Sequence, residues 1–250
     1  MMDTYFIELN FIWIGVAVIT FLSLIIFNIR APYGRHANEK WGKMISNHWG
    51  WFWMELPAFL LFPVLTILGP RDKDLLTWIL VGLWSLHYLN RTIIFPFRLR
   101  TRGKKMPLTI VFSALFFNGM NGFLNGYWLG FLAPKDGPVS ILVILGVILF
   151  FTGMYINMST DSRLIALRKK QSGYQIPRGW LFKYISCPNH FGEIIEWTGF
   201  AIAAWSVPSA TFAIWTFCNL APRALNHHEW YHESFEDYPK DRKAFLPKIW

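Results

Sequence analysis

Charged residues are scarce in this chain, and long stretches have none. Asp, Glu, Lys and Arg make up 16% of the 250 residues, whereas 54% are hydrophobic and 18% are aromatic. Several apolar runs reach about 20 residues, the length that a helix needs to cross the hydrocarbon core of a bilayer. This composition argues against a soluble domain and predicts an integral membrane protein.

Cysteine is also nearly absent. The chain has only Cys187 and Cys218, one in a predicted cytoplasmic loop and one inside an apolar run, so a disulfide framework is not expected. The N-terminal residues MMDTYFIE lack the basic region of a signal peptide, which indicates that the first apolar run is a retained helix. Internal repeats and domain boundaries are lacking too, so residues 1–250 are expected to form one membrane domain.

The positive charge that remains is unevenly distributed. The formal net charge is +9, and 20 of the 24 Lys and Arg residues fall in four segments, at 29–50, 98–106, 159–190 and 223–250. Nearly neutral connections at 70–74 and 133–138 alternate with these segments, which is the positive-inside pattern of membrane proteins. No basic segment has the motif of a nucleic-acid-binding domain, so no nucleic-acid partner is expected.

Seven segments are predicted to cross the membrane as helices, which makes the expected fold an all-α bundle. They are residues 9–29, 51–69, 75–97, 108–133, 139–158, 191–206 and 208–225. A basic loop is expected at 159–190 and a polar tail after residue 225. Seven crossings put the chain ends on opposite sides, and the charge pattern predicts an N-terminus outside and a cytoplasmic C-terminus.

Polar side chains interrupt several of these spans. Glu55 lies in the second and Arg91 in the third, where a charge facing lipid is costly, so both are expected to face the bundle interior. The residues alone leave open whether they form an ion pair between helices or contact a bound molecule. Tyr88 lies deep in the third span. A phenol beside a desolvated, protonated carboxyl group can donate hydrogen bonds to a carbonyl oxygen.

The fourth span contains two sets of small or polar residues. Gly119, Gly122 and Gly126 do not follow a strand, as a dinucleotide-binding turn requires, so we interpret them as a close helix contact. Asn118, Asn121 and Asn125 are spaced to share one face of the helix.

The C-terminal segment matches the H-E-x-x-H pattern of zinc proteases at residues 228–232. In that reading His228 and His232 would bind zinc and Glu229 would act as the base. The candidates for a third ligand, Glu233 and Glu236, fit no recognised spacing, so no metal site is expected. A membrane zinc protease is kept as the alternative from a different class.

Five segments together carry a resemblance to a known family. They are ELPAF at 55–59, HYLNRT at 87–92, YQIPRGWLFKYIS at 174–186, NHFGEIIEW at 189–197 and RALNHHEWYHESFEDYPKDRKAFLPKIW at 223–250. Nearly the whole chain resembles the steroid 5-alpha-reductase family. The last three segments occur in looser form in related membrane reductases and methyltransferases, whereas the first two are similar to segments that line the steroid pocket. We expect a bacterial-type or otherwise non-mammalian member.

The resemblance implies reduction of the 4,5 double bond of a 3-oxo-4-ene steroid by hydride transfer from NADPH to C5. Glu55 and Tyr88 match the pair that hydrogen-bonds the 3-oxo group. Residues that match NADPH contacts are Asn189 and Glu193 at the nicotinamide end, then Arg91, Asn157, Asp161, Arg168, Arg223, His227 and Tyr231, with Tyr33, Arg35, Arg100 and Arg102 as loop contributors. Residues up to about 133 would form the substrate half, and those from about 139 the cofactor half.

The sequence departs from the family pattern at three positions. Met54 stands where Gln is usual beside the pocket Glu, Glu229 stands where a basic residue is common, and Asn226 replaces a His. The change at Met54 bears on which sterol is preferred. An enoyl-CoA or polyprenol substrate on the same scaffold is therefore kept as the first alternative, and methyl transfer from S-adenosylmethionine as another.

The expected partners and location follow from the same reading. Basic loops with Arg91 and Arg223 suit polyanionic NADPH, because Arg binds phosphate through two hydrogen bonds. A Trp- and Phe-rich cavity suits a steroid that enters from the lipid. The membrane is expected to be a bacterial inner membrane or the endoplasmic reticulum, and a monomer is compatible with the pattern.

Overall fold

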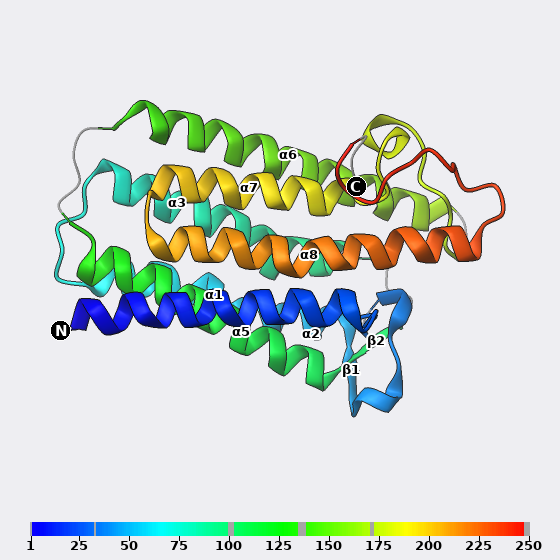
Figure 1. The fold of residues 1–250 in the computed structure, drawn as a ribbon, viewed down its shortest axis with the longest axis horizontal. Coiled ribbons are helices and arrows are strands. Elements are labelled where there is room, and N and C mark those ends of the chain that lie inside the picture. The colour runs from blue at the N-terminus through cyan, green and yellow to red at the C-terminus, as the bar shows by residue number, and fades with distance from the viewer. Residues whose placement is uncertain (1, 33, 100–102, 135–138, 171–172, 248–250) are drawn as a thin grey trace.

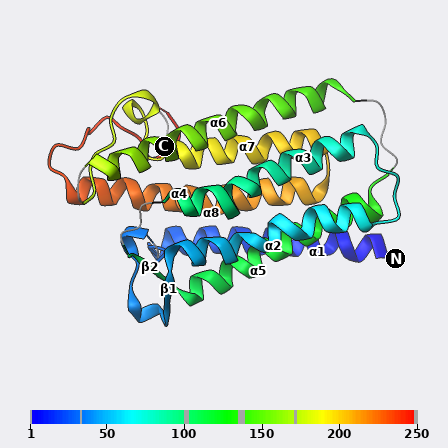
Figure 2. The same ribbon diagram turned by 180° about the vertical axis from the view of Figure 1, so that it is seen from behind.

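A computed structural model of the chain describes residues 2–32, 34–99, 103–134, 139–170 and 173–247. The protein is mostly helical, and its long helices run side by side along one axis (Figures 1 and 2). The elements in chain order are α1 (Met2–Ile26), 3-10 turns at Gly34–His36 and Glu39–Trp41, β1 (Met44–Ser46), α2 (Asn47–Leu68), α3 (Leu75–Leu89), a π-helical turn (Asn90–Ile94), α4 (Phe95–Arg98), β2 (Lys105–Pro107), α5 (Leu108–Tyr127), a second π-helical turn (Trp128–Leu132), α6 (Ile141–Lys170), a 3-10 turn (Trp180–Lys183), α7 (Pro188–Ala204) and α8 (Val207–Ser234).

Glycines let α6 and α7 pack backbone to backbone. A Cβ atom at Gly192 would lie 2.7 Å from the backbone nitrogen of Asn157 and from the carbonyl oxygen of Gly153. A Cβ atom at Gly199 would lie 2.6 Å from the carbonyl oxygen of Gly146. Small residues at such a contact are how membrane helices approach closely. The two helices therefore hold their polar side chains at a fixed separation.

The predicted close contact at the glycines of the fourth span is confirmed at two positions. A Cβ atom at Gly126 would lie 2.8 Å from the carbonyl oxygen of Phe62 in α2, and one at Gly122 would lie 3.3 Å from Cα of Ala58. The prediction is wrong at Gly119, where an added Cβ meets no described atom within 4 Å.

The predicted loop at 159–190 is wrong over its first part, because α6 continues to Lys170. The polar residues that suggested a loop are satisfied within the helix. Thr160 Oγ1 donates to the Ile156 carbonyl at 2.7 Å, and Ser162 Oγ donates to the Met158 carbonyl at 2.7 Å. The helix therefore continues beyond the apolar part of the span without leaving these hydroxyl groups unsatisfied.

The first part of the predicted polar tail after residue 225 is helical, because α8 reaches Ser234. Its polar end is joined to the end of α1 by an ion pair. The Arg30 guanidinium donates to both oxygens of Glu233, at 2.6 and 2.9 Å, and this hydrogen-bonded cation lowers the pKa of Glu233. At the other end of the chain, α1 begins at Met2, before the predicted start at residue 9.

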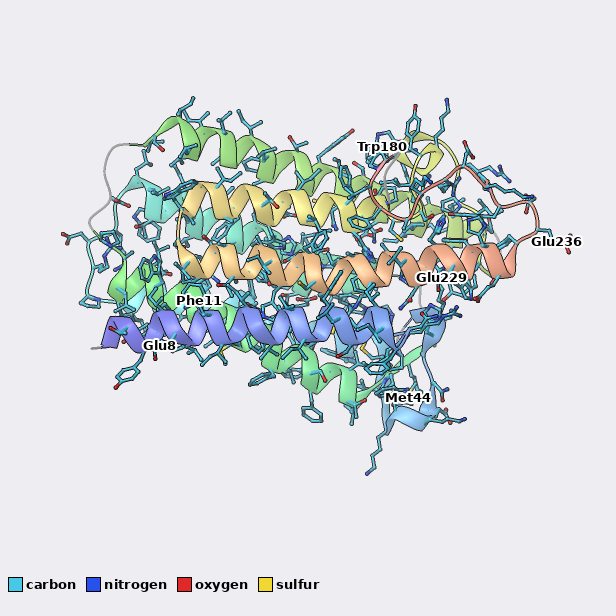
Figure 3. All side chains as sticks on the ribbon, in the orientation of Figure 1. Glu8, Phe11, Met44, Trp180, Glu229 and Glu236 are labelled. Atoms are coloured by element: carbon cyan, nitrogen blue, oxygen red, sulfur yellow. The ribbon has the colours of Figure 1, made fainter. Side chains whose placement is uncertain are left out.

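A two-stranded sheet was missed by the sequence analysis. β1 and β2 pair antiparallel, with Met44 opposite Pro107 and Ser46 opposite Lys105. The pair lies beside one end of the bundle, where Met44 marks its position in Figure 3. Strands of three residues show too little periodicity to be recognised in a sequence. The pair ties the starts of α2 and α5 together.

Four helical segments of the described chain are long and apolar enough to cross a membrane. They are Thr4–Ile26, Asn47–Leu68, Leu108–Leu132 and Ile141–Lys169. The segments that follow α1, α4, α6 and α8 gather at one end of the bundle, and the α2–α3 and α7–α8 connections lie at the opposite end (Figure 1). The chain is therefore a helical membrane protein whose basic segments share one end.

Candidate functional site

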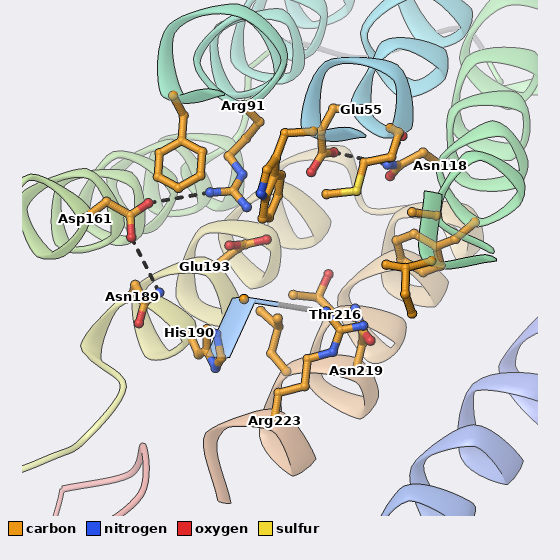
Figure 4. Close-up of a pocket in the computed structure, with 18 of the residues that line it drawn as sticks. Glu55, Arg91, Asn118, Asp161, Asn189, His190, Glu193, Thr216, Asn219 and Arg223 are labelled. Atoms are coloured by element: carbon orange, nitrogen blue, oxygen red, sulfur yellow. Dashed lines mark hydrogen bonds and ion pairs between the residues drawn. The ribbon is translucent and has the colours of Figure 1, made fainter. Parts of the chain in front are cut away.

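A cavity of about 610 Å³ opens inside the bundle, within the usual size range of ligand pockets. Its wall is built from all eight α-helices that the structure describes, together with β2, the 3-10 turn at Gly34–His36 and the π-helical turn at Asn90–Ile94. The predicted site residues on this wall are Arg35, Glu55, Tyr88, Arg91, Asp161, Arg168, Asn189, Glu193, Arg223, His227 and Tyr231. Residues far apart in the sequence thus face one space (Figure 4).

Of the predicted site residues that the structure describes, Asn157 is not on this wall. Asn157 lies behind it, where its side-chain nitrogen donates to the Asn189 carbonyl at 3.1 Å and to Glu193 Oε2 at 3.1 Å. Asn157 therefore holds two wall residues in place. Tyr33, Arg100 and Arg102 lie outside the described residues.

Glu55 and Tyr88 lie on the cavity wall with their polar ends available. The nitrogen of Asn118 donates to Glu55 Oε2 at 3.1 Å and to the Met54 carbonyl at 2.6 Å. The Tyr88 hydroxyl has no hydrogen-bond partner within the described chain, and its ring packs against Trp84 and Trp197, at centroid distances of 5.1 and 5.8 Å. A phenol and a carboxyl group are therefore held on rigid helices, facing a space that a carbonyl group can enter.

Arg91 forms its ion pair with α6. Its Nη1 lies 3.5 Å from Asp161 Oδ2, and Asp161 Oδ1 is 3.5 Å from the Asn189 side-chain nitrogen (Figure 4). The guanidinium carbon also lies 4.8 Å from the ring centroid of Trp51. Arg91 therefore does form an ion pair between helices, as one of the two interpretations of the sequence expected, but its partner is Asp161 and not Glu55.

Arg35 lies in an aromatic cage at another part of the cavity. Its guanidinium carbon is 4.2 Å from the ring of Trp230, 4.6 Å from that of Tyr231 and 4.8 Å from that of Tyr174. Its Nη2 also donates to the Tyr231 hydroxyl at 3.4 Å. Aromatic faces attract a guanidinium without neutralising it. The cage therefore presents a positive charge to the cavity.

Buried polar atoms without partners show which ligand suits this region. Within the part of the chain that the structure describes, Arg35 Nη1, His190 Nδ1 and His227 Nδ1 are buried and make no hydrogen bond. The rings of His36, His227 and His190 form a row with 5.7 Å between neighbouring centroids. A buried polar atom left unsatisfied costs about 1–3 kcal/mol. The arrangement fits a ligand rich in acceptor oxygens, such as the phosphates of a dinucleotide.

The sequence analysis assigned no role to several polar residues of this wall, among them Asn118, His87 and His190. His87 Nδ1 lies 2.7 Å from Glu196 Oε1, and both side chains are buried. For Asn118 and His87 the available signal was a polar residue inside an apolar span, whereas His190 lies at the end of the predicted loop at 159–190 and gave no such signal. The partners lie on other helices, so the sequence alone could not pair them.

The histidines of the zinc-protease pattern have other partners. His228 Nδ1 lies 2.6 Å from Ser186 Oγ, and Glu229 lies 3.7 Å from Arg30. Among the described residues, no group of three or more His, Cys, Asp or Glu side chains is placed to hold a metal ion. His228 therefore contacts the loop that carries Ser186.

Comparisons with known proteins agree over most of the chain. A family model described as 3-oxo-5-alpha-steroid 4-dehydrogenase matches residues 104–250. The steroid 5-alpha-reductase DET2 of Solanum lycopersicum is 38% identical over 248 residues, 96% of each chain. The 3-oxo-5-alpha-steroid 4-dehydrogenase 1 of Bos taurus is 40% identical over 243 residues, 94% of this chain and 92% of the relative.

The human 3-oxo-5-alpha-steroid 4-dehydrogenase 1 is 41% identical over 220 residues, 86% of this chain and 85% of the relative. Plant and mammalian relatives match at similar identity, so the comparisons give no support to a non-mammalian, bacterial-type origin. Matches of this extent include both ELPAF at 55–59 and the C-terminal signature segments. The chain belongs to the steroid 5-alpha-reductase, or 3-oxo-5-alpha-steroid 4-dehydrogenase, family of oxidoreductases.

Proposed function

We propose that the protein reduces the 4,5 double bond of a 3-oxo-4-ene steroid with NADPH. The observation that carries the proposal is one cavity whose wall holds both Glu55 and Tyr88 and a set of arginines. The membership of the steroid 5-alpha-reductase family supports the steroid substrate. Aromatic residues such as Trp197 and Phe117 on the same wall suit a flat apolar ring system.

The arginines would hold the cofactor, which when bound supplies a hydride for C5 of the steroid, and a proton from solvent or a nearby group would then be added at C4 to complete the reduction. Arg35, Arg168 and Arg223 suit the phosphates, because a guanidinium binds phosphate through two hydrogen bonds. Asn189 and Glu193, which Asn157 holds together, suit a carboxamide that both donates and accepts hydrogen bonds.

Glu55 and Tyr88 would activate the steroid. In its protonated form Glu55 donates a hydrogen bond to the 3-oxo oxygen, and the Tyr88 hydroxyl donates another. Both bonds strengthen as negative charge develops on that oxygen, so they stabilise the transition state more than the bound substrate. Because both side chains are buried on helices, they are oriented before the substrate arrives.

Product identification tests the proposed reaction. Membranes containing the protein are incubated with NADPH and a 3-oxo-4-ene steroid, and the products are identified by mass spectrometry. We expect the 4,5-reduced steroid. Parallel incubations with an enoyl-CoA and a polyprenol test the alternative substrates, and reduction of one of these in place of the steroid would contradict the proposal.

Substitutions test the two proposed donors. Tyr88→Phe and Glu55→Gln should each lower kcat by about 10²–10³-fold, the usual loss for one transition-state donor. Tyr155→Phe is the matched control, because Tyr155 is exposed on α6 and does not line the cavity. Near-full turnover in both site variants would refute the assignment.

We also propose the finer topology that the sequence predicts. Seven crossings would leave the N-terminus outside and the C-terminus in the cytoplasm, in a bacterial inner membrane or the endoplasmic reticulum. The gathering of the basic segments at one end supports this orientation (Figure 1). In one domain, residues up to about 133 would supply most of the substrate contacts and the rest most of the cofactor contacts. The steroid would enter from the lipid.

A further inference from the structure

Asn118 on α5 contacts the backbone of Met54 and the side chain of Glu55, and the proposed function gives this residue no role. Its side-chain nitrogen lies 2.6 Å from the Met54 carbonyl and 3.1 Å from Glu55 Oε2 (Figure 4). A carbonyl oxygen can only accept a hydrogen bond, so the Asn118 atom beside it must be the nitrogen. One of its two N–H groups points to Met54, and the other is left for Glu55.

This contact decides which oxygen of Glu55 can carry a proton. Because Asn118 donates to Oε2, that oxygen must accept, and a proton there would oppose the N–H group. In the protonated acid the hydrogen therefore sits on Oε1, which has no partner among the described residues. Glu55 lines the cavity, so the O–H group becomes available to a ligand carbonyl.

The backbone around Asn118 makes the contact rigid. One turn later on α5, Gly122 approaches α2 so closely that an added Cβ would lie 3.3 Å from Cα of Ala58. Asn118 is itself buried, with 5% of its surface exposed. A short side chain on a helix held this close to α2 cannot move away from Glu55 without disturbing the packing.

The neighbour of Glu55 explains why this chain depends on Asn118. Met54 is the residue before Glu55, and its thioether has no N–H to donate. The described structure gives the Glu55 carboxyl no hydrogen-bond donor other than Asn118. We propose that Asn118 is a positioning residue that keeps the Glu55 proton on Oε1, directed at the substrate carbonyl. This inference rests on the proposed function.

Two variants of Asn118 and one control test it. Asn118→Asp keeps the shape but replaces the NH₂ group by oxygen, and Asn118→Leu removes all polar atoms. Asn125→Leu is the control, because Asn125 is a buried amide on the same face of α5 that donates to the Asn121 carbonyl at 3.0 Å and is absent from the cavity wall.

Steady-state turnover is measured with NADPH and a 3-oxo-4-ene steroid, on purified protein whose thermal unfolding has been checked. We expect both Asn118 variants to lose about 10²-fold in kcat, the effect of misplacing a reacting group by about 1 Å, while KM stays within about threefold. Asn125→Leu should lose less than about threefold. Unchanged kcat in Asn118→Asp would overturn the proposal, as would an equal loss in the control.

A double-mutant cycle separates positioning from a general structural effect. In a Glu55→Leu background, Asn118→Leu should lower the residual rate by less than about threefold, because its target is gone. If Asn118→Leu lowered kcat by about 10²-fold in that background too, Asn118 would act through a group other than Glu55, and the proposal would be overturned. If the wild type forms no reduced steroid, the proposed function fails as well; if it does and Asn118 is silent, only this inference fails.

Discussion

His87 and Glu196 form a buried pair that joins α3 to α7 next to Tyr88. The two side chains lie 2.7 Å apart, and the rings of Tyr88 and Trp197 are 5.0 and 4.6 Å from that of His87. Apolar surroundings make a polar contact stronger and a broken one more costly. The pair therefore holds the backbone that carries Tyr88.

We expect Glu196→Leu to destabilise the protein by about 2 kcal/mol, because it leaves the His87 ring buried without its partner. Glu196→Gln keeps a hydrogen-bonding oxygen and should cost less. Thermal unfolding in detergent measures both. Glu229→Gln is the control at an exposed position and should change stability by less than about 0.5 kcal/mol. Equal stability of Glu196→Leu and the wild type would contradict this role.

His36 predicts a pH dependence of cofactor binding. Burial lowers the pKa of His36, and the charges of Arg35 and Arg30 lower it further, whereas Glu233 raises it. The imidazole is thus mostly neutral at pH 7. A polyanion bound beside His227 would favour the protonated ring, so NADPH affinity should rise as the pH falls from 8 to 6.

Calorimetric titration with NADPH at these pH values checks the sign. The His36→Gln variant has no imidazole at position 36 to protonate, so its affinity for NADPH should change less with pH than that of the wild type. An identical pH dependence in the two proteins would show that His36 is not coupled to the cofactor.

At the scale of elements, the α6–α7 contact positions Asn189 and Glu193 on the cavity wall. Asn157 on α6 reaches Glu193 on α7 at 3.1 Å, which is possible because Gly153 and Gly192 let the backbones meet. Changes in this contact should therefore move Glu193, which faces the cavity.

Gly199→Ala should destabilise the bundle by about 1–3 kcal/mol, because the new Cβ would overlap the Gly146 carbonyl. Gly82→Ala is the matched control. A Cβ at Gly82, inside α3, meets no described atom within 4 Å, so the higher helix propensity of Ala should stabilise it by up to about 1 kcal/mol. Thermal unfolding of both variants measures the difference, and two equal shifts would contradict it.

At the scale of the whole molecule, the two chain ends test the number of crossings. Seven crossings predict that Thr4 lies outside and Glu236 inside, and both side chains are exposed. Single cysteines at these positions, in a variant without Cys187 and Cys218, can be labelled with a maleimide that does not cross membranes. We expect labelling from opposite sides. Labelling from the same side would require an even number of crossings.

Individual residues show which features of the fold and the site could be predicted from the sequence. The scarcity of charge predicted a helical membrane protein, because a bilayer permits few alternatives for long apolar runs. ELPAF and HYLNRT identified the family, since they are local segments that survive without knowledge of the fold. Helix ends were less predictable: Thr160 and Ser162 look like loop residues, but a helix can satisfy them internally.

The sequence by itself determined the membrane class, the mostly helical fold and the family. It also named most of the polar residues that face the cavity. Only the tertiary structure decided their partners: Asp161 for Arg91, Glu196 for His87 and Asn118 for Glu55. Each pair joins two helices that are distant in the chain. The geometry of these pairs depends on glycine-mediated packing and on the rotation of each helix about its axis. Neither can be predicted from the periodicity of a single helix.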